Sequence, residues 1–315
     1  MLKVGILGVG GISSAHISGW KTVTDAKIVA MCDIRPERME KYEGVNKYTS
    51  FDDMIASDQL DVIDICLPTY LHVEYSIKAM QKGINVLCEK PISLNQEDID
   101  KVYTCAKENN VKFMIAHVIR FWREYEFIKQ VFDDNRYGKL LTGNMARYSG
   151  FPKWSWDGWL FDEKRSGLVP FDLHIHDLDY LVYAFGEPKN QKVNRSKLSD
   201  QDVFSCIYEF DDFFINVEAA WFAAPVPFAM KFRFQFEKAV LVFENNTLKI
   251  YESNGKVFEP FNETEGENGN IGLPKSSAYA EEIKYFANAV LNNQNPDKVS
   301  KESVEIVLKL LNNIK

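Results

Sequence analysis

The chain has 315 residues, more than a single hydrophobic core usually holds, and this length favours two domains. Hydrophobic residues make up 46% and charged residues 26%, which is the composition of a globular protein and excludes a disordered or fibrous chain. The net charge of −8, with no cluster of lysine and arginine, argues against nucleic acid as a partner.

The start of the chain, its apolar windows and its cysteines predict a cytoplasmic location. Met1–Gly8 enters a strand-like run without a charged leader or a cleavage site. The most apolar later window, Phe213–Met230, is interrupted by Asn216, Glu218 and prolines, so no membrane span is expected. The five cysteines are scattered and lie mostly in apolar runs, which indicates buried thiols in a reducing compartment rather than disulfides or a metal site.

In residues 1–118, short apolar runs alternate with segments of helical periodicity. The expected strands are Lys3–Gly8, Lys27–Asp33, Val62–Leu67, Asn85–Cys88 and Lys112–Ala116. The expected helices are Ile12–Thr22, Pro36–Tyr42, Leu71–Lys82 and Gln96–Asn109. Continuously apolar strands that alternate with helices indicate a parallel sheet covered on both faces. This half is therefore predicted to be a doubly wound α/β domain.

Residues 119–315 follow a different pattern and are expected to form an α+β domain. Helices are expected over Phe121–Phe132 and His174–Phe185. Lys231–Glu237 alternates between apolar and polar residues, as a half-buried antiparallel strand does. Asn245–Asn246 lies between two strand-like runs and predicts a hairpin turn. This half should therefore contain a largely antiparallel sheet, followed by an exposed loop at Asn262–Asn270.

A glycine-rich turn follows the first expected strand. Gly8 permits a tight turn, and Gly10 allows the backbone to approach a pyrophosphate. The helix that begins near Gly11 and Ile12 offers free N–H groups to the negative charge. Ser13 stands where the dinucleotide-binding fingerprint has a third Gly or Ala. The motif alone could also be a structural turn without a ligand.

Asp33, at the end of the second expected strand, strengthens the dinucleotide interpretation. A carboxylate at this place binds the ribose hydroxyls and repels a 2′-phosphate, which favours NAD over NADP. Arg35 and Arg38 leave NADP possible, since a nearby arginine can accommodate the phosphate. The alternative is that both arginines are solvated charges at the start of a helix.

Glu89-Lys90-Pro91 follows the expected strand Asn85–Cys88, at the sheet edge where open α/β folds bind their ligands. Lys90 could hydrogen-bond the reacting oxygen and stabilise the negative charge that develops on it during hydride transfer. An isolated lysine at a strand end could instead be a solvated surface residue.

The segment around Asp172 and His176 carries the second group of candidates. In a helix that begins by Asp172, these two residues share one face and His174 points away. His176 can take the hydroxyl proton as an alcohol is oxidised, because the pKa of histidine lies near working pH. Asp172 could orient the substrate or raise the basicity of His176. The alternative is that Asp172 caps the helix and both histidines are packing residues.

These residues resemble the Gfo/Idh/MocA family, the group of glucose-fructose oxidoreductase, inositol dehydrogenase and rhizopine catabolism proteins. The matching features are Gly8-x-Gly10, Asp33, Pro68-x-x-x-His72, Glu89-Lys90-Pro91, Arg120-Phe121 and Asp172-x-x-x-His176-Asp177. They occur in order over nearly the whole chain. The chain departs from the family pattern at His174 and Ser166, where glycine is frequent.

The resemblance implies an N-terminal Rossmann domain, a C-terminal α+β domain with an open sheet, and NAD(P)-dependent chemistry on sugars or cyclitols. It implies that the catalytic set is Lys90, Asp172 and His176. It places further residues near the cofactor: Leu67, Pro68, His72 and Glu89. Because the family often uses its open sheet for assembly, a homodimer or homotetramer is expected.

Three tryptophans, Trp154, Trp156 and Trp159, precede the Asp172 segment. Exposed indoles stack on the apolar faces of sugar rings, although large aromatic residues more often fill cores and interfaces. We take the tryptophans as candidate substrate contacts. Weaker candidates of the same kind are Arg120, Arg147 and Tyr148.

The leading prediction is a dehydrogenase in which Lys90 holds the oxygen, His176 removes the proton, and NAD accepts hydride from a sugar, polyol or cyclitol. A dinucleotide-binding sensor without catalysis is an alternative, against which the presence of Lys90, Asp172 and His176 argues. A hydrolase that uses transient oxidation by tightly held NAD is a further alternative. A cofactor that copurifies without net turnover would distinguish it.

Overall fold

The structure is a computed structural model, and it describes residues 1–261 and 276–314. The described residues form two units. Unit 1 comprises residues 1–118 and the described part of 266–305, and unit 2 comprises the described parts of 119–265 and 306–315. The predicted domains were residues 1–118 and 119–315. The two units differ from them because the described part of 266–305 belongs to unit 1. The loop expected at Asn262–Asn270 lies outside the described residues.

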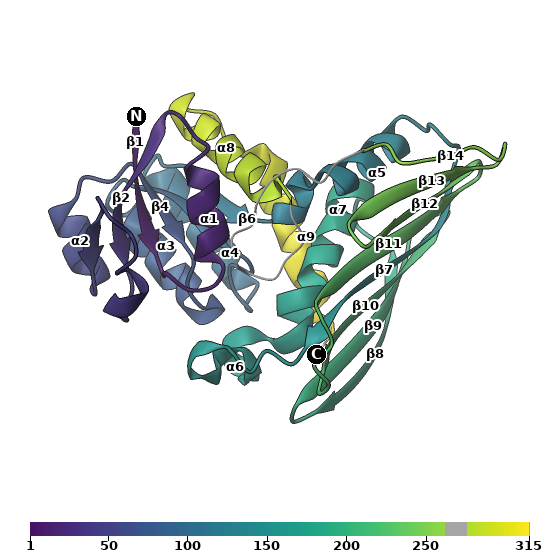
Figure 1. Ribbon diagram of the computed structural model, residues 1–315, viewed down its shortest axis with the longest axis horizontal. Helices are drawn as coiled ribbons and strands as arrows, with labels where there is room; N and C mark the ends of the chain where they lie inside the picture. Colours follow the sequence, from purple (N-terminus) through teal and green to yellow (C-terminus); the bar gives the residue numbers. More distant parts are fainter. Residues whose placement is uncertain (262–275, 315) are drawn as a thin grey trace. The chain divides into compact units, whose positions relative to one another are not determined.

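Unit 1 is built on a parallel sheet with the strand order β3-β2-β1-β4-β5-β6 (Figure 1). The strands are β1 (Leu2–Leu7), β2 (Ala26–Cys32), β3 (Asn46–Tyr48), β4 (Val62–Ile65), β5 (Asn85–Glu89) and β6 (Phe113–Ala116). β4 and β6 are buried along their whole lengths, as strands covered by helices on both faces are. The strand order reverses between β1 and β4, where open α/β sheets bind their ligands. The predicted doubly wound α/β fold is confirmed.

Short helices connect these strands. They are α1 (Ser13–Trp20), η1 (Pro36–Arg38), α2 (Phe51–Ser57), η2 (Thr69–Leu71), α3 (His72–Met80) and α4 (Glu97–Glu108). The helix expected over Pro36–Tyr42 is wrong in extent, since only the 3-10 turn η1 forms. Met39 is the one buried residue of that segment, so no apolar face stabilises further helical turns.

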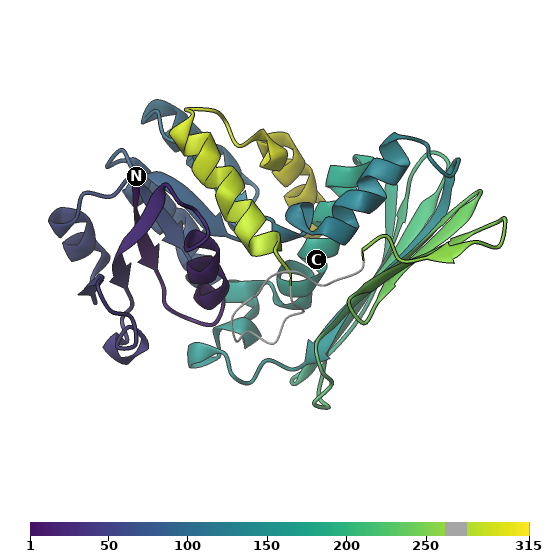
Figure 2. The ribbon, with the colours of Figure 1, turned by 45° about the horizontal axis from the view of Figure 1, so that its top comes forward.

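The C-terminal helix α8 (Ala278–Leu291) belongs to unit 1, where it packs on α1 (Figure 2). Gly19 makes this contact close, because a Cβ at that position would lie 2.5 Å from Cδ1 of Ile283. Ile283 and Phe286 are fully buried. Residues 276–305 therefore contribute to the core of unit 1, although they follow the strands of unit 2 in sequence. They also contain η6 (Asp297–Val299) and the start of α9 (Lys301–Asn312).

Unit 2 contains a sheet with the strand order β14-β13-β12-β11-β7-β10-β9-β8. The strands are β7 (Leu140–Gly150), β8 (Asn190–Leu198), β9 (Gln201–Glu209), β10 (Phe214–Phe222), β11 (Ala229–Phe236), β12 (Ala239–Glu244), β13 (Thr247–Glu252) and β14 (Val257–Phe258). Neighbouring strands are antiparallel except for β7 and β10, which are parallel. The predicted α+β fold with a largely antiparallel sheet is confirmed.

Helices α5 (Arg123–Asp133) and α7 (Ile175–Phe185) cover one face of this sheet (Figure 1). The remaining helical segments of this part of the chain are η3 (Val118–Phe121), η4 (Trp156–Phe161), α6 (Glu163–Ser166) and the π-helical turn η5 (Pro170–His174). The phenylalanines of β11 are buried, whereas Lys231, Arg233 and Gln235 are exposed, so the predicted alternation is confirmed.

The turn between β12 and β13 is formed by Asn245 and Asn246, which have φ angles of 50° and 61°. Asparagine is one of the few residues that tolerate this left-handed backbone, and two such residues make the tight hairpin turn that matches the twist of a sheet. The predicted hairpin is confirmed.

The cysteines are free and buried, as expected. Unit 1 contains Cys32, Cys66, Cys88 and Cys105, and unit 2 contains Cys206. Among the helices of residues 1–261 and 276–314, none combines the length and the hydropathy that a membrane span requires.

Candidate functional site

The glycine turn lies where β1 ends beside β4. Gly8 has a φ angle of 90°, a backbone conformation that only glycine adopts without strain. A Cβ at Gly8 would lie 2.7 Å from the carbonyl oxygen of Cys66, so the neighbouring strand end also excludes a side chain. The N–H of Gly8 donates to the carbonyl oxygen of Cys32, 2.8 Å away, which ties the turn to β2.

The next residues leave open space at the start of α1. A Cβ built on Gly10 or Gly11 would meet nothing within 4 Å. Ile12, at the N-cap of α1, supplies no side-chain cap to the helix, and no acidic residue lies in its first turn. Ser13 donates its hydroxyl to the carbonyl oxygen of Gly10, and the N–H groups of the next two residues donate to backbone carbonyls within the same turn. The open backbone at Gly10 and Gly11, together with the positive end of the helix dipole, fits a pyrophosphate.

Asp33 lies beside this turn with its carboxylate held in place. Its Oδ2 accepts the N–H of Val9 at 2.8 Å, and its Oδ1 accepts the N–H of Arg35 at 2.9 Å. The Nε of Arg35 is also 3.3 Å from Oδ1. Since each carboxylate oxygen accepts more than one hydrogen bond, the group can still bind ribose hydroxyls. The structure thus joins Asp33 to the glycine turn, as a dinucleotide site requires.

Lys90 is half-buried at the end of β5. Its backbone N–H donates to Oε2 of Glu89, 3.0 Å away, and the Lys90–Pro91 peptide bond is cis. His72 holds the same turn from the other side, with Nδ1 2.7 Å from the carbonyl oxygen of Pro91 and Nε2 2.7 Å from that of Leu67. His72 thus links the backbone that follows β4 to the backbone that follows β5. Leu67 and Pro68 are half-buried.

A buried polar network that the sequence pattern does not reveal lies beneath this turn. His16, in α1, contacts Asp64 of β4 through Nδ1 and Glu89 of β5 through Nε2, each at 2.9 Å. Trp20 donates its indole N–H to Oδ2 of Asp64 at 2.7 Å. Nothing in the sequence pattern pairs these residues, because 48 and 73 positions separate His16 from its two partners.

The same network contains a set of atoms with metal-ligand character. Donor atoms of His16, Asp64 and Cys66 lie within 4.8 Å of one another. Both oxygens of Asp64 already accept hydrogen bonds, and burial raises the pKa of the Cys66 thiol to about 12, so it stays protonated. Hydrogen bonds therefore account for the cluster without an ion.

In unit 2, the segment from Ser166 to Val182 is buried except at two residues, Asp172 and His176. Both are half-buried. Asp172 lies in the π-helical turn η5, and His176 lies in the first turn of α7. Single π-helical turns are frequent at functional sites. The fold therefore makes the two predicted catalytic groups of this segment accessible and covers its other polar side chains.

His174 is one of the covered side chains. Its Nε2 lies 2.7 Å from the hydroxyl of Tyr208, and its ring lies against Phe204. Burial, aided by the nearby Arg147, lowers the pKa of His174 to about 3, so it is neutral at working pH. The expectation that His174 points away from the Asp172 face agrees with these contacts, and it makes His174 a packing residue.

The arginines proposed as weaker substrate contacts are part of the core instead. Arg120 is only 1% exposed, and its guanidinium donates to both oxygens of Asp179. Arg147 is likewise buried and donates to both oxygens of Asp177. We therefore correct the expectation for both residues: their charges are satisfied by buried aspartates, which sequence analysis did not pair with them.

The predicted tryptophans differ in exposure. Trp154 is 79% exposed and Trp156 is 39% exposed, whereas Trp159 is half-buried in η4. Phe151 and Phe161 stack on each other at 4.5 Å between ring centres, which closes the segment into a compact loop. Trp154 and Trp156 are thus the two exposed indoles of this loop.

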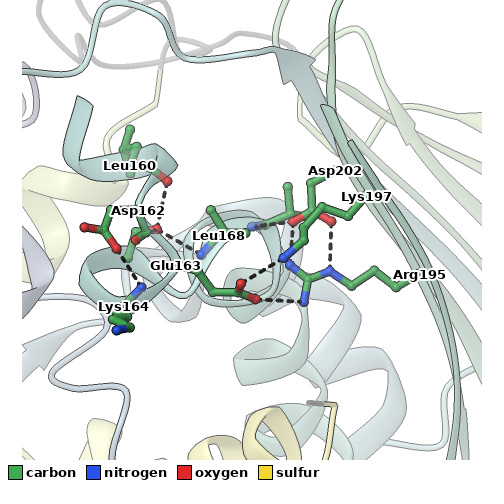
Figure 3. A network of polar contacts seen from close by, with 10 residues as sticks. Leu160, Asp162, Glu163, Lys164, Leu168, Arg195, Lys197 and Asp202 are labelled. Atoms are coloured by element: carbon green, nitrogen blue, oxygen red, sulfur yellow. Dashed lines mark hydrogen bonds and ion pairs between the residues drawn. The ribbon is translucent and has the colours of Figure 1, made fainter. Parts of the chain in front are cut away.

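A network of ion pairs anchors the end of this loop to the hairpin of β8 and β9 (Figure 3). Glu163 accepts Nζ of Lys197 at 2.8 Å and lies 3.9 Å from the guanidinium of Arg195. Arg195 also donates twice to Asp202, at 2.8 and 2.7 Å. Oδ2 of Asp202 accepts the N–H of Val169 at 3.2 Å. These contacts fix the backbone that leads into η5.

A strained residue lies within this anchored stretch. Leu168 is buried and has a φ angle of 60°, which is uncommon for a residue with a branched side chain. Its N–H donates to the hydroxyl of Ser166, which donates in turn to the carbonyl oxygen of Leu160 (Figure 3). Such strain persists only where the surroundings fix the backbone, as here before Asp172.

Comparison with known families covers most of the two units. Residues 2–117 match the model of the GFO/IDH/MocA oxidoreductase family with an NAD-binding Rossmann fold. Residues 125–242 match the model of the GFO/IDH/MocA C-terminal domain.

Curated relatives show partial similarity. A 2,7-anhydro-N-acetylneuraminate hydratase of Mediterraneibacter gnavus is 32% identical over 138 residues, 44% of this chain and 37% of that protein. A myo-inositol 2-dehydrogenase of Thermotoga maritima is 27% identical over 208 residues, 64% of this chain and 60% of that protein. The matched part of the chain thus spans less than two thirds of the length of either relative.

A solved structure shows the fold over the whole chain. An oxidoreductase from Agrobacterium radiobacter, in complex with NAD+, L-tartaric acid and magnesium, has a TM-score of 0.82 and 17% identity. The similarity covers 99% of this chain and 94% of that one. At this identity the likeness concerns the fold alone. With both of its domains matched, the chain belongs to the Gfo/Idh/MocA family of oxidoreductases, and residues 2–117 form its NAD-binding Rossmann fold.

Proposed function

We propose that the protein is an NAD-dependent dehydrogenase that interconverts a hydroxyl group of a sugar, polyol or cyclitol and the corresponding ketone. The dehydrogenase relative from Thermotoga maritima, which acts on myo-inositol by its name, supports this substrate class. The glycine turn with Asp33 supports the cofactor.

One observation carries the proposal: from Ser166 to Val182, only Asp172 and His176 are not buried. A carboxylate and an imidazole that stay accessible in an otherwise covered segment are suited to binding a substrate and moving its proton. The neighbouring His174, Asp177 and Asp179 are buried in the core, where they contact a tyrosine hydroxyl and two buried arginines. A sensor without catalysis would not need this selective exposure.

Oxidation of the substrate removes one proton from its hydroxyl group and one hydride from the carbon. The ammonium group of Lys90 donates a hydrogen bond to the reacting oxygen, and an imidazole nitrogen of His176 takes the hydroxyl proton. Asp172 orients the hydroxyl and stabilises the protonated imidazole. NAD, held by the glycine turn and Asp33, would supply the hydride acceptor, so that oxidation of the alcohol would give the ketone. The reverse reaction returns the same proton and hydride.

We propose NAD rather than NADP as the preferred cofactor. The carboxylate of Asp33 would repel a 2′-phosphate, and the Nε of Arg35 is already 3.3 Å from Oδ1 of Asp33. Arg35 therefore supports the carboxylate that binds ribose, although it keeps NADP possible as a weaker ligand.

Two further proposals concern the substrate and the assembly. Trp154 and Trp156 stack on a sugar ring, since the anchored loop leaves both indoles exposed.

The polar face of β11, with Lys231, Arg233 and Gln235 exposed, supports a homodimer or homotetramer through the sheet. Light scattering of the purified protein measures the subunit number directly.

The decisive experiment follows nicotinamide absorbance with NAD and with NADP, across inositols, aldoses and sugar alcohols. Lys90→Met should lower turnover by about 100-fold or more, since it removes the charge that stabilises the reacting oxygen. Lys82→Met makes the same change at an exposed residue after α3 and should leave turnover unaltered.

Equal turnover in Lys90→Met and Lys82→Met would contradict the role of Lys90. Absence of any absorbance change, with NAD bound and copurifying, would contradict net oxidation and favour transient oxidation within a single turnover, as in a hydratase or hydrolase.

A further inference from the structure

His16 is buried between two carboxylates in the core of unit 1. Its Nδ1 lies 2.9 Å from both oxygens of Asp64, and its Nε2 lies 2.9 Å from Oε1 of Glu89. His16 and Asp64 are fully buried, and Glu89 is 6% exposed. Ionised carboxylates can only accept hydrogen bonds, so both ring nitrogens of His16 must donate. The arrangement therefore requires an imidazolium cation.

The charges around the ring favour the same state. Burial lowers the pKa of His16, but the charge and the hydrogen bond of Asp64 raise it well above its ordinary value. Burial raises the pKa of Glu89, but the hydrogen bond and charge of His16 lower it overall. The titratable groups that face this pair from the surrounding elements include Asp64, Cys66, His72, Cys88, Lys90 and Tyr279.

Glu89 connects the buried cation to the edge of the sheet. While its Oε1 accepts from His16, its Oε2 accepts the backbone N–H of Lys90 at 3.0 Å. The carboxylate binds both donors most strongly while it is ionised. A protonated Glu89 would carry a donor on one oxygen, which would weaken the contact that this oxygen accepts.

We propose that His16 is a positioning residue for Lys90: with Asp64 behind it, its ring holds Glu89 as an ionised, oriented carboxylate that fixes the backbone amide from which the Lys90 side chain extends. This inference rests on the proposed role of Lys90 in hydride transfer. It adds a part of the site that lies in α1, the helix that also begins the dinucleotide-binding turn. Cofactor binding and the placement of Lys90 therefore share one helix.

The variant His16→Gln tests this arrangement by removing the cation. Asp64 and Glu89 then face each other without a positive charge between them, and one of the two must take up a proton as pH falls. The ratio of the kcat of the variant to that of the wild type should fall about tenfold between pH 8 and pH 6. A tenfold fall is what protonation of Glu89 causes when the pH is one unit below its pKa in the variant. The KM for NAD should change by less than about threefold, because the glycine turn is retained.

A second substitution distinguishes a charge effect from a loss of packing. Asp64→Asn combined with His16→Gln removes the competing carboxylate, so Glu89 can stay ionised beside Lys90. The ratio of the kcat of the double variant to that of the wild type should therefore be independent of pH, although the same buried ring is missing. Trp20→Phe is the matched control: it removes a different donor to Asp64 and leaves His16 between its carboxylates.

Two measurements do not depend on turnover. Nitrogen NMR of labelled histidine should show His16 with both ring nitrogens protonated from pH 5 to pH 8, whereas an unperturbed histidine would titrate near 6.5. Hydrogen exchange of the Lys90 amide should accelerate about tenfold at pH 6 in His16→Gln and remain near the wild-type rate in Trp20→Phe.

The outcomes separate this inference from the proposed function. A neutral His16, or a kcat ratio that does not change with pH in His16→Gln, would overturn the positioning role even in an active dehydrogenase. If Lys90→Met keeps full turnover, the proposed function fails, while the NMR and exchange results still decide whether His16 holds Glu89.

Discussion

The two units bury charge beneath their site residues in different ways. In unit 1 the buried cation is His16, a group that can lose its proton, and it lies between Asp64 and Glu89. In unit 2 the buried cations are Arg120 and Arg147, which keep their protons at any working pH. The support beneath Lys90 is therefore sensitive to pH, whereas the ion pairs that hold the scaffold of unit 2 are not.

The two buried histidines sharpen this difference. His16 and His174 are equally inaccessible, yet the pKa of His16 is raised and that of His174 is lowered to about 3. Carboxylates surround His16, whereas His174 contacts a tyrosine hydroxyl and lies near the cation Arg147. Burial alone does not decide the charge of a histidine; the sign of its neighbours does.

The largest expected effect is in the permanent ion pairs of unit 2. Asp177→Asn leaves Arg147 buried without an ionised partner, which should lower the free energy of unfolding by about 3–5 kcal/mol. Urea unfolding at neutral pH measures this loss. Asp211→Asn, at an exposed ion pair with Lys189, is the matched control and should have no measurable effect. Equal stability of the two variants would show that the buried pair is not needed.

A smaller effect is expected from pH in unit 1. The His16 network makes its full contribution to stability between about pH 4.5 and 6.5, the ordinary pKa values of glutamate and histidine. Its contribution is lost as pH falls through the lowered pKa of Glu89, and as pH rises through the raised pKa of His16. Between pH 6.5 and that raised pKa, the protection of α1 against hydrogen exchange should decline by about 1.4 kcal/mol per pH unit, and above the raised pKa the decline should stop.

The His16→Gln variant is the control for this decline, because it has no imidazolium to lose. An equal alkaline decline in the variant would assign the effect to another group. The ion pairs of unit 2 predict no such decline in the hydrogen exchange of α7. Both helices are measured in the same sample, so α7 is an internal control.

The smallest expected effect concerns His174. Because its pKa is depressed, the unfolded chain takes up a proton more readily than the folded one, so stability is complete above pH 6.5 and is lost as pH falls. Between pH 6.5 and 5.5 this loss should be about 1 kcal/mol. His174→Gln keeps a partner for Tyr208 and should lack this acid slope in urea unfolding. The same slope in both proteins would mean that His174 is already charged in the fold.

The sequence was sufficient for the fold where local pattern and tertiary environment agree. The apolar strand Phe113–Ala116 and the turn at Asn245–Asn246 were predictable from residue type alone. The strand Asn46–Tyr48 was not, because it is short and polar and exists by pairing with β2. Helix α2 was missed although Ser50 caps it through the N–H of Asp53, a signal that the sequence does contain.

The candidate site divides in the same way. Gly8, Asp33 and Lys90 follow strand ends, so their places could be predicted from the strands. The partners of buried charges could not, since Arg120 and Asp179 are 59 positions apart and no local pattern joins them. From residue type alone, Arg120 was a candidate to bind a substrate. In the fold, its guanidinium is instead bound by the carboxylate of Asp179.

The buried cysteines have a practical consequence. All are free and covered, with those of unit 1 in or near its strands and helices and Cys206 in the sheet of unit 2. A thiol reagent such as Ellman's reagent can therefore react only when a unit opens. Reaction rates at Cys66 and Cys206, read by mass spectrometry, would report the opening of the two units separately without any engineered probe.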